Sequence, residues 1–492
     1  MKFKIKRLKL YTGWPYVAVM NELDAKLLGL HPMDRILIKS GTKSAYTILD
    51  VSQHGNTLKR GELGVFEELW DALQCSLANV EPISKPKSIE YIKKKMEGFT
   101  LNEKEIFEII KDITLRRISD IEITYFVDSF YINGFTKQEV IWLTKAMVKT
   151  GEKLSFKGKV ADKHCVGGVP GNRTTMIIVP IIAASGLKIP KTSSRSITSP
   201  AGTADTMEVL ADVTKTSDEI TKIVNRIGGC IVWGGYIQLA PADDQIIRIE
   251  HPLSIDAEGQ LLASVIAKKI SAGSKYLLID IPFGIGSKCK TKYSAKRLGS
   301  AFLELASYFG LRTHVCFTYG SEPIGNGIGP ALEAIDVMKV LENHRDAPLD
   351  LKVKALTLAG KLFELTGKSR KGKGYSFAKQ ILKSGKALKK MNEIIDAQGR
   401  KVKHWNKIKL GKYKRNIVAK RTGKLKGIDN QSVSKLARIL GCPDDKYAGI
   451  FLYKHVGAKI KKGEKLFTLY AEVPHKLKEG LSFLRHNRVL SY

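Results

Sequence analysis

The sequence predicts a multidomain α/β protein. With 492 residues, the chain is longer than one hydrophobic core usually holds, so two to four domains are expected, and 43% hydrophobic residues are enough to build their cores. The apolar pattern changes along the chain from alternating to helical, and then to short apolar runs separated by helical stretches. Together these observations predict a small N-terminal β domain, a helical domain, a central α/β sheet domain and a C-terminal α+β domain.

The N-terminal β domain is expected over residues 1–86. Apolar and polar residues alternate in YVAVM, DRILIK and AYTILDV, with turn signals between them, which is typical of strands. The segment DAKLLGLHPMDRILIK resembles the helical-turn-then-strand unit of double-psi barrels. No polar side chains converge in this stretch. It is therefore interpreted as an ordinary β module without a ligand, for which a role in assembly is the natural suggestion.

The helical domain is expected over residues 87–155, after a linker at 83–88, with a second part at about 240–272. Thr100, with Glu103 three residues later, predicts a capping box that opens a helix. Two apolar sets recur at helical spacing, namely Ile106, Ile109 and Ile110, and then Phe126, Phe130 and Ile132.

The central domain is expected over residues 156–239 and 273–410. Four short runs, rich in β-branched residues and bounded by Gly or Pro, predict buried strands of an α/β sheet: TTMIIVPIIAASG, GCIVWGG, YLLIDIP and HVCFTYG. In residues 411–492, IVAKRTG and AGIFLYKHVGAKIKKGEKLFTLYAE, with Gly/Lys turns, indicate a smaller α+β domain.

The formal charge of +34 fits either a protein that follows nucleic acid or one that concentrates small anionic substrates. Much of the excess lies in residues 368–426, where Glu393 and Asp396 are the only acids. This segment is interpreted as a solvated basic face with glycine hinges. Its aromatic residues are too sparse for a base-stacking platform, so nucleic acid is not an expected partner.

Nothing in the sequence indicates export or a membrane. The apolar run 176–184 is short and contains Pro180, and residues 1–9 lack the apolar core of a signal peptide. The six cysteines are widely scattered and form neither a C-x-x-C motif nor a zinc-binding pattern. We therefore expect a cytoplasmic enzyme without a metal.

Two segments carry the clearest chemical signal, DKHCVGGVPGNRTT at 162–175 and SSRSITSPAGTADTME at 193–208. Glycines let backbone N–H groups approach a phosphate closely, and nearby Lys, Ser and Thr side chains supply charge and hydroxyl donors. A single glycine-rich loop marks a plain turn more often than a site. Two such segments with these side chains predict a phosphate-binding cradle.

The pairing of the two segments resembles the thymidine/pyrimidine-nucleoside phosphorylase family, and the wider pattern is most like its archaeal branch. The resemblance extends through residues 98–113 and 256–273 to VGAKIKKGEKLFTLYAE near the C-terminus. It implies phosphorolysis of AMP and other nucleoside 5′-monophosphates to the free base and ribose 1,5-bisphosphate, in nucleotide salvage and degradation. Inorganic phosphate is then the co-substrate, no cofactor is needed, and a homodimer or larger homo-oligomer is expected.

The resemblance assigns the phosphate to Lys163, Gly168, Ser194 and Thr203, with Thr174 or Thr175 as a further hydroxyl. It implies ten substrate-binding positions: Gly168, Ser194, Arg195, Ser196, Ile197, Thr198, Ser199, Thr203, Ser264 and Lys288. Cys165 stands where the pyrimidine enzymes usually have serine. Because a thiol is a weak donor and phosphorolysis needs no covalent intermediate, Cys165 is interpreted as a small packed residue.

The base-binding side departs from the pyrimidine pattern. Ser264 and Lys268 retain the family's Ser-x-x-x-Lys pair, but Ile249 occupies the apparent position of the base-reading arginine, with Arg248 one residue away. Asp256 lies just ahead of the helix that carries this pair. It is either an N-terminal helix cap or the general acid that protonates N7 of a departing purine. The resemblance favours the general acid.

A nucleotide substrate also needs a site for its 5′-phosphate. The available candidates are Arg195, Ser196, Ser199 and Lys288. Lys288 follows a glycine-containing loop after the run YLLIDIP, where ligands gather in α/β sheets, although a plain surface lysine fits the same pattern.

Two other functions fit parts of the pattern. A phosphoribosyltransferase of the anthranilate type would share the helical and α/β architecture, and it would depend on pyrophosphate chemistry. A basic nucleic-acid-binding protein would fit the net charge, and it would bind polynucleotides in a salt-sensitive manner.

Overall fold

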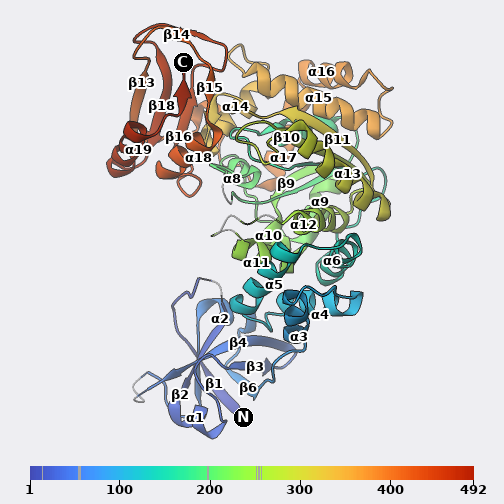
Figure 1. Cartoon of the computed structure of the whole chain (residues 1–492), viewed down its shortest axis with the longest axis vertical. Coiled ribbons are helices and arrows are strands. Elements are labelled where there is room, and N and C mark those ends of the chain that lie inside the picture. Colours follow the sequence, from blue (N-terminus) through green and yellow to red (C-terminus); the bar gives the residue numbers. More distant parts are fainter. Residues whose placement is uncertain (14, 54–56, 197–198, 251, 253–254, 256) are drawn as a thin grey trace. The chain divides into compact units, whose positions relative to one another are not determined.

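The computed structural model describes residues 1–13, 15–53, 57–196, 199–250, 252, 255 and 257–492. The chain divides into two compact units (Figure 1). The first comprises residues 1–150 and 241–263, and the second comprises residues 151–240 and 264–492. Within the described part of the chain, no helix has the length and apolar character needed to cross a membrane.

The first unit begins with a closed six-stranded barrel in the order β1-β5-β2-β4-β3-β6. The strands are β1 (Lys2–Arg7), β2 (Val17–Asn21), β3 (Arg35–Ser40), β4 (Lys43–Ser52), β5 (Glu62–Val65) and β6 (Leu77–Pro82), with two short helices, α1 (Glu22–Leu27) and α2 (Glu67–Leu73). Alternate residues such as Ala18, Met20, Ile36 and Ile38 fill the interior. The strands predicted from YVAVM, DRILIK and AYTILDV are confirmed.

The rest of this unit is helical, with α3 (Ser88–Met96), α4 (Glu103–Thr114), α5 (Asp120–Asn133), α6 (Lys137–Thr150), α11 (Pro241–Glu250) and the start of α12 (Glu258–Ser271). Ile106, Ile109 and Ile110 are fully buried on α4, as predicted. Two expectations here are wrong. The capping box of α4 is made by Asn102 and Glu105 instead of Thr100 and Glu103, and Ile132 is 70% exposed instead of packed beside Phe126 and Phe130.

The second unit contains the central parallel sheet. Its strands are β7 (Ala161–Cys165), β8 (Ile189–Ser193), β9 (Gly229–Trp233), β10 (Tyr276–Phe283) and β11 (Arg312–Tyr319). The parallel sets β11-β10-β7 and β8-β9 are joined by a bridge between Val160 and Lys188, which gives the order β11-β10-β7-β8-β9. The strands predicted from GCIVWGG, YLLIDIP and HVCFTYG are confirmed. Because the chain runs outward from β7 in both directions, the sheet has a switch point between β7 and β10.

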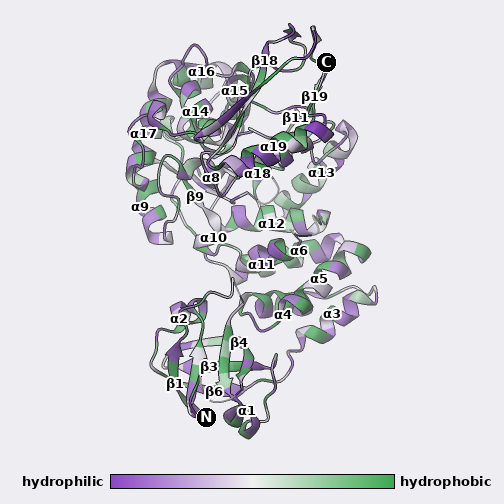
Figure 2. Cartoon of the chain, turned by 90° about the vertical axis from the view of Figure 1, so that its left-hand side faces the viewer, coloured by the Kyte–Doolittle hydropathy of each residue, from purple (hydrophilic) through white to green (hydrophobic). Residues whose placement is uncertain are grey.

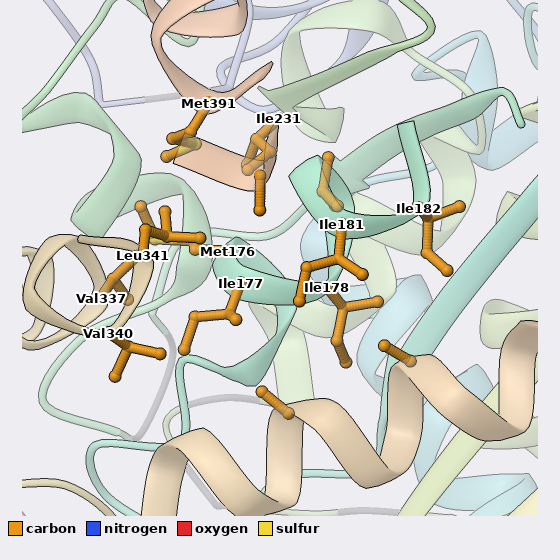
Figure 3. Close-up of a cluster of buried hydrophobic side chains, with 14 of the residues drawn as sticks. Met176, Ile177, Ile178, Ile181, Ile182, Ile231, Val337, Val340, Leu341 and Met391 are labelled. Atoms are coloured by element: carbon orange, nitrogen blue, oxygen red, sulfur yellow. The ribbon is translucent and has the colours of Figure 1, made fainter. Parts of the chain in front are cut away.

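The run TTMIIVPIIAASG forms a helix, so the strand predicted there is wrong. This helix, α7 (Thr174–Ala184), is buried from Thr174 to Ala183. Figure 3 shows its isoleucines packed among Ile231 of β9, Val337 and Leu341 of α14 (Pro330–Leu341) and Met391 of α17 (Lys386–Gln398). A helix that is apolar on every side has no amphipathic period, and its sequence then looks like a buried strand.

Further helices surround the sheet: α8 (Thr203–Glu208), α9 (Ser217–Ile227), α10 (Gly234–Ile237), α13 (Lys292–Tyr308), α15 (Leu349–Leu365) and α16 (Gly374–Lys383). Helices α9 and α17 carry both hydrophilic and hydrophobic residues (Figure 2). The basic segment 368–426 contains α16 and α17, which have buried faces, as well as a charged surface. Glycines of this segment begin and end its helices or allow them to pack closely. Gly385 and Gly399 flank α17 with positive φ. A Cβ on Gly374 would lie 2.1 Å from the Gly360 carbonyl oxygen, so α16 and α15 pack closely at this point.

The C-terminal part contains both strands and helices. A four-stranded sheet runs in the order β12 (Gly327–Ile328), β16 (Gly449–Leu452), β18 (Lys465–Ala471) and β13 (Tyr413–Val418). The C-terminal part also contains two small strand pairs, β14 (Gly423–Lys424) with β17 (Lys459–Ile460) and β15 (Gly427–Ile428) with β19 (Leu490–Ser491). Its helices are α18 (Asn430–Ile439) and α19 (Pro474–His486).

Candidate active site

The two glycine-rich segments lie at the carboxyl edge of the sheet, next to its switch point. The loop after β7 touches the loop after β10, because a Cβ on Gly168 would lie only 2.7 Å from the backbone nitrogen of Lys288. Gly168 has a φ of +91°, a backbone conformation that side chains disfavour. Any larger residue would therefore push the two loops apart. This close approach fixes the shape of the site.

Lys163, on β7, is fully buried. Its Nζ donates to Oγ1 of Thr174 at 3.2 Å and lies 3.5 Å from Oγ1 of Thr175. Thr174 is the first residue of α7, so the ammonium group lies at the N-terminus of an 11-residue helix. A buried cation, two hydroxyls and a helix N-terminus together provide an environment for an anion. The structure thus brings together three residues that the phosphate motif singles out.

A buried carboxylate balances this cation. Oδ2 of Asp280, on β10, lies 3.8 Å from Nζ of Lys163 and 3.3 Å from Nζ of Lys354 on α15. The other oxygen accepts a hydrogen bond of 2.6 Å from Thr318. Desolvation raises the pKa of Asp280, but the two lysines outweigh it and keep the pKa below its ordinary value. Asp280 is therefore ionised, and it holds Lys163 in place.

Cys165 belongs to the same network. Its thiol donates to Oδ2 of Asp280 at 3.3 Å and accepts from Nδ2 of Asn172 at 3.2 Å. Burial, together with the charge of Asp280, raises the pKa of this thiol. A thiol with a raised pKa is a poor nucleophile. The geometry therefore supports a packed, hydrogen-bonded role for Cys165.

Asp205 organises the described residues between β8 and α8. The Asp205 carboxylate accepts the backbone N–H of Ser196 at 2.7 Å and that of Gly202 at 2.8 Å, which opens helix α8 at Thr203. Ser199 donates its hydroxyl to the Ala201 carbonyl at 3.0 Å. Ser194 is exposed directly after β8. The predicted substrate residues Ile197 and Thr198 lie outside the described residues.

Arg195 is held by two carboxylates. Its guanidinium donates to Glu208 at 2.7 and 2.9 Å and to Asp205 at 3.2 Å, and it lies 4.8 Å from the centre of the Trp233 ring. The hydrogen bonds from Arg195, with help from Lys446, lower the pKa of Glu208 to about 2. The charge of Arg195 is thus balanced within the protein. A 5′-phosphate at this position would have to compete with two carboxylates.

Arg173 is a site residue that the sequence pattern did not identify. Its Nη1 donates to Oγ1 of Thr203 at 3.2 Å, its Nη2 donates to the Ala201 carbonyl, and its Nε donates to Glu333 on α14. One side chain therefore ties the first glycine-rich segment to the second. The motif GNRTT contains this arginine, but Glu333 is 160 residues away, so the sequence gives no local signal of the pairing.

The opposite face of β7 also carries buried charge. Asp162 accepts a hydrogen bond of 2.7 Å from Lys269 and lies 3.8 Å from Nζ of Lys191. The neighbouring His164 has a pKa well below its ordinary value, first because of burial and then because of the positive charges of Lys269, Lys191, Lys163 and Lys288. His164 is therefore neutral near pH 7. The lysines around it create a positive field that attracts anions.

The residues expected on the base side are only partly described. Asp256 lies outside the described residues. Ser264 and Lys268 are one turn apart on α12, and Lys288 is exposed in the loop after β10. Arg248 donates to the Asp120 carboxylate at 2.8 and 2.5 Å. In the described part of the chain, no group of three or more His, Cys, Asp or Glu residues could hold a metal ion.

Three family descriptions match the chain: "Glycosyl transferase family, helical bundle domain" at residues 89–151, "Glycosyl transferase family, a/b domain" at 157–254, and "Pyrimidine nucleoside phosphorylase C-terminal domain" at 424–491. The chain is 45% identical over 491 residues to AMP phosphorylase of Thermococcus kodakarensis, covering 99% of this chain and 96% of that relative. The chain belongs to the AMP phosphorylase family. The relative from Pyrococcus furiosus is 44% identical, with 99% of this chain and 96% of the relative covered. The relative from Methanococcus vannielii is 42% identical, with 95% and 93% covered.

Solved structures support the fold of this AMP phosphorylase family member. Anthranilate phosphoribosyltransferase from Thermus thermophilus matches with a TM-score of 0.52 and 17% identity, covering 63% of this chain and 99% of that structure. The enzyme of the same name from Saccharomyces cerevisiae matches with a TM-score of 0.51 and 15% identity, covering 63% and 97%. At such low identity the likeness concerns the fold alone. The expected family resemblance is confirmed.

Proposed function

We infer that this protein is a pentosyltransferase that cleaves AMP with inorganic phosphate to give adenine and ribose 1,5-bisphosphate. The nearly full-length similarity to AMP phosphorylases supports this function. Among structural features, the buried Lys163 ammonium at the N-terminus of α7, together with the tightly packed Gly168 loop, carries the argument. It offers a dehydrated cationic site for the attacking phosphate. CMP and UMP are expected as further substrates.

We propose that Lys163, Gly168, Ser194 and Thr203 hold the phosphate, with Thr174 or Thr175 supplying a further hydroxyl. Cleavage of an N-glycosidic bond develops positive charge on the sugar. A phosphate oxygen held beneath the sugar stabilises that charge and is already placed for attack, so positioning supplies much of the acceleration. In this scheme phosphate is the only co-substrate, and the protein provides no cofactor and no metal.

We propose that Asp256 is the general acid that protonates N7 of the departing adenine. The remaining substrate contacts are assigned to Arg195, Ser196, Ile197, Thr198, Ser199, Ser264 and Lys288. For the 5′-phosphate we favour Lys288, because the charge of Arg195 is balanced by Glu208 and Asp205. In addition, the backbone of Lys288 already contacts the phosphate loop at Gly168.

The proposed assembly is a homodimeric catalytic core in the cytoplasm, with the N-terminal barrel joining such cores into a larger homo-oligomer. We assign this barrel to the double-psi type because of its helical-turn-then-strand unit, α1 followed by β3. Deletion of residues 1–83 tests the assembly role. The truncated protein should remain folded, cleave AMP and contain fewer subunits per particle by light scattering. An unchanged number of subunits would exclude this role for the barrel.

The function is tested by incubating the protein with AMP, CMP, UMP, adenosine and thymidine, with and without phosphate. Release of base and ribose 1,5-bisphosphate from the nucleotides, only when phosphate is present, is the expected result. Thymidine should be a poor substrate, because Ile249 replaces the base-reading arginine and Arg248 pairs with Asp120. Product formation from anthranilate and a phosphoribosyl pyrophosphate would instead identify a phosphoribosyltransferase.

A further inference from the structure

The first unit contains a cavity that the proposed reaction does not use. It lies between the barrel and helices α5 and α11 and has a volume of about 170 Å³. Its lining residues include three arginines, Arg35, Arg116 and Arg248, and one acidic residue, Asp120. Tyr16 and Tyr46 also line it. A cavity of this size, lined by more basic than acidic residues and by two tyrosines, is suited to a small organic anion.

Arg116 occupies a position that the backbone does not favour for arginine. It follows α4 with a φ of +56°, and its N–H and that of Arg117 close the helix on the carbonyls of Ile113 and Asp112 at 3.0 and 2.8 Å. Glycine usually occupies such a left-handed helix end, because a Cβ is disfavoured there. An arginine at this position carries a backbone cost, and a strained residue of this kind is a reason to examine its side chain for a function.

The side chain of Arg116 reaches the cavity over an aromatic ring. Its guanidinium carbon lies 4.1 Å from the centre of the Tyr16 ring. Burial is the main cause that lowers the pKa of Arg116, and the positive charge of Arg248 lowers it further, against the opposing effects of Tyr16, Asp120 and Glu68. Two cations that repel each other across a partly buried cavity would both be stabilised by an anion between them.

Arg248 already has an acidic partner within the protein. Its guanidinium donates to Asp120, the first residue of α5, at 2.8 and 2.5 Å. The neighbouring Arg35 is paired with Glu122 at 2.6 Å. An incoming phosphate group carries more charge than one carboxylate and can accept from both guanidinium groups at once. It would take the place of the Asp120 carboxylate on Arg248.

We propose that this cavity binds a small phosphorylated molecule, with its phosphate group between Arg116 and Arg248 and its organic part against Tyr16 and Tyr46. Guanidinium groups match the geometry of phosphate oxygens, and the N-terminus of the 14-residue helix α5 adds a favourable dipole. The site is separate from the Lys163 site, which belongs to the other unit, and it does not depend on the proposed reaction.

Site-resolved hydrogen–deuterium exchange on the full-length protein tests the proposal. Inorganic phosphate, ribose 5-phosphate and ribose are the probes, and peptides that cover residues 112–124 are the readout. Slower exchange there with ribose 5-phosphate, but not with ribose, is expected. Equal slowing by phosphate alone would identify the free ion as a sufficient ligand. No effect of either phosphate compound, or an equal effect of ribose, would overturn the proposal.

Two variants with opposite expected effects make the test specific. Arg116→Gly removes the guanidinium and suits the backbone, so it should fold and keep its activity while binding roughly tenfold or more weakly. Asp120→Asn removes the competing carboxylate and should bind more tightly. Arg345→Ala, a 90% exposed arginine of the second unit, is the control and should change nothing. The proposal would be refuted if ribose 5-phosphate protected residues 112–124 equally well in Arg116→Gly and in wild type. Loss of this protection in Asp120→Asn would also refute it.

The same measurement separates this proposal from the proposed reaction. Peptides that cover residues 162–175 record phosphate at the Lys163 site, and AMP cleavage is assayed on the same preparations. Protection at 162–175 without protection at 112–124 would remove the second site and leave the reaction intact. The reverse pattern would support the second site and count against the assignment of Lys163.

Discussion

Replacing Lys163 by methionine should weaken phosphate binding and leave the fold intact. The methionine side chain fills a similar volume, and Asp280 keeps Lys354 at 3.3 Å and the Thr318 hydroxyl at 2.6 Å. Loss of a hydrogen bond to a charged group costs roughly 1.5–3 kcal/mol. We therefore expect kcat/KM for phosphate to fall by about 10- to 150-fold, measured from adenine release at varied phosphate concentrations.

Lys354→Met is the matched control. Both variants remove one lysine from the same buried carboxylate, so both should lower the melting temperature to a similar extent. Only the variant at residue 163 removes the cation that lies beside Thr174 at the start of α7. An equal loss of kcat/KM in both variants would show that the effect comes from Asp280. An unchanged kcat/KM in Lys163→Met would remove this lysine from the phosphate site.

Three further predictions concern single carboxyl and thiol groups. Asp256→Asn should lower kcat by about 10²–10⁴-fold with little change in AMP binding, because a general acid acts mainly in the transition state; near-normal turnover would make Asp256 a helix cap. Burial raises the pKa of Asp336 to about 6, so the native state favours the protonated carboxyl. The stabilisation that results is fully present below the unfolded pKa of 3.8 and is lost as the pH rises through 6. As the pH rises from about 4 to 7, Asp336→Asn should therefore gain stability relative to wild type, by at most about 3 kcal/mol. A difference in melting temperature between the two proteins that stays the same over this pH range would contradict this. Cys165→Ser should retain activity, because a hydroxyl can make the same hydrogen bonds to Asp280 and Asn172; loss of turnover would show that the thiol has a chemical role.

The sequence could predict the elements whose pattern is local. Strands β9, β10 and β11 are short apolar runs bounded by glycine or proline, and the Ile106 face of α4 repeats at helical spacing. Helix α7 could not be predicted in this way, because every side of it is buried and its period disappears. The capping box of α4 lay two residues from the predicted one, since Asn102 and Glu105 fit the same spacing as Thr100 and Glu103.

In the site, too, the sequence could predict the residues that belong to local motifs but not their partners from distant parts of the chain. The sequence motifs contain Lys163, Thr174 and Gly168, which the structure places around two touching loops. The carboxylates that orient the site come from elsewhere: Asp280 pairs with Lys163 from β10, and Glu333 pairs with Arg173 from α14. Such pairings depend on which strands and helices pack side by side, and the residues themselves carry no local signal of them.

The burial of α7 has a consequence for the motion of the phosphate loop. Backbone amides exchange with water only when their segment opens, and the most deeply packed elements open only with the whole domain. The amides of α7, enclosed by the core on every side, should therefore be among the slowest to exchange. Because the Gly168 loop leads into this helix, one end of the loop is anchored in the core. Phosphate then enters a cradle that is already ordered, and little conformational entropy is lost on binding.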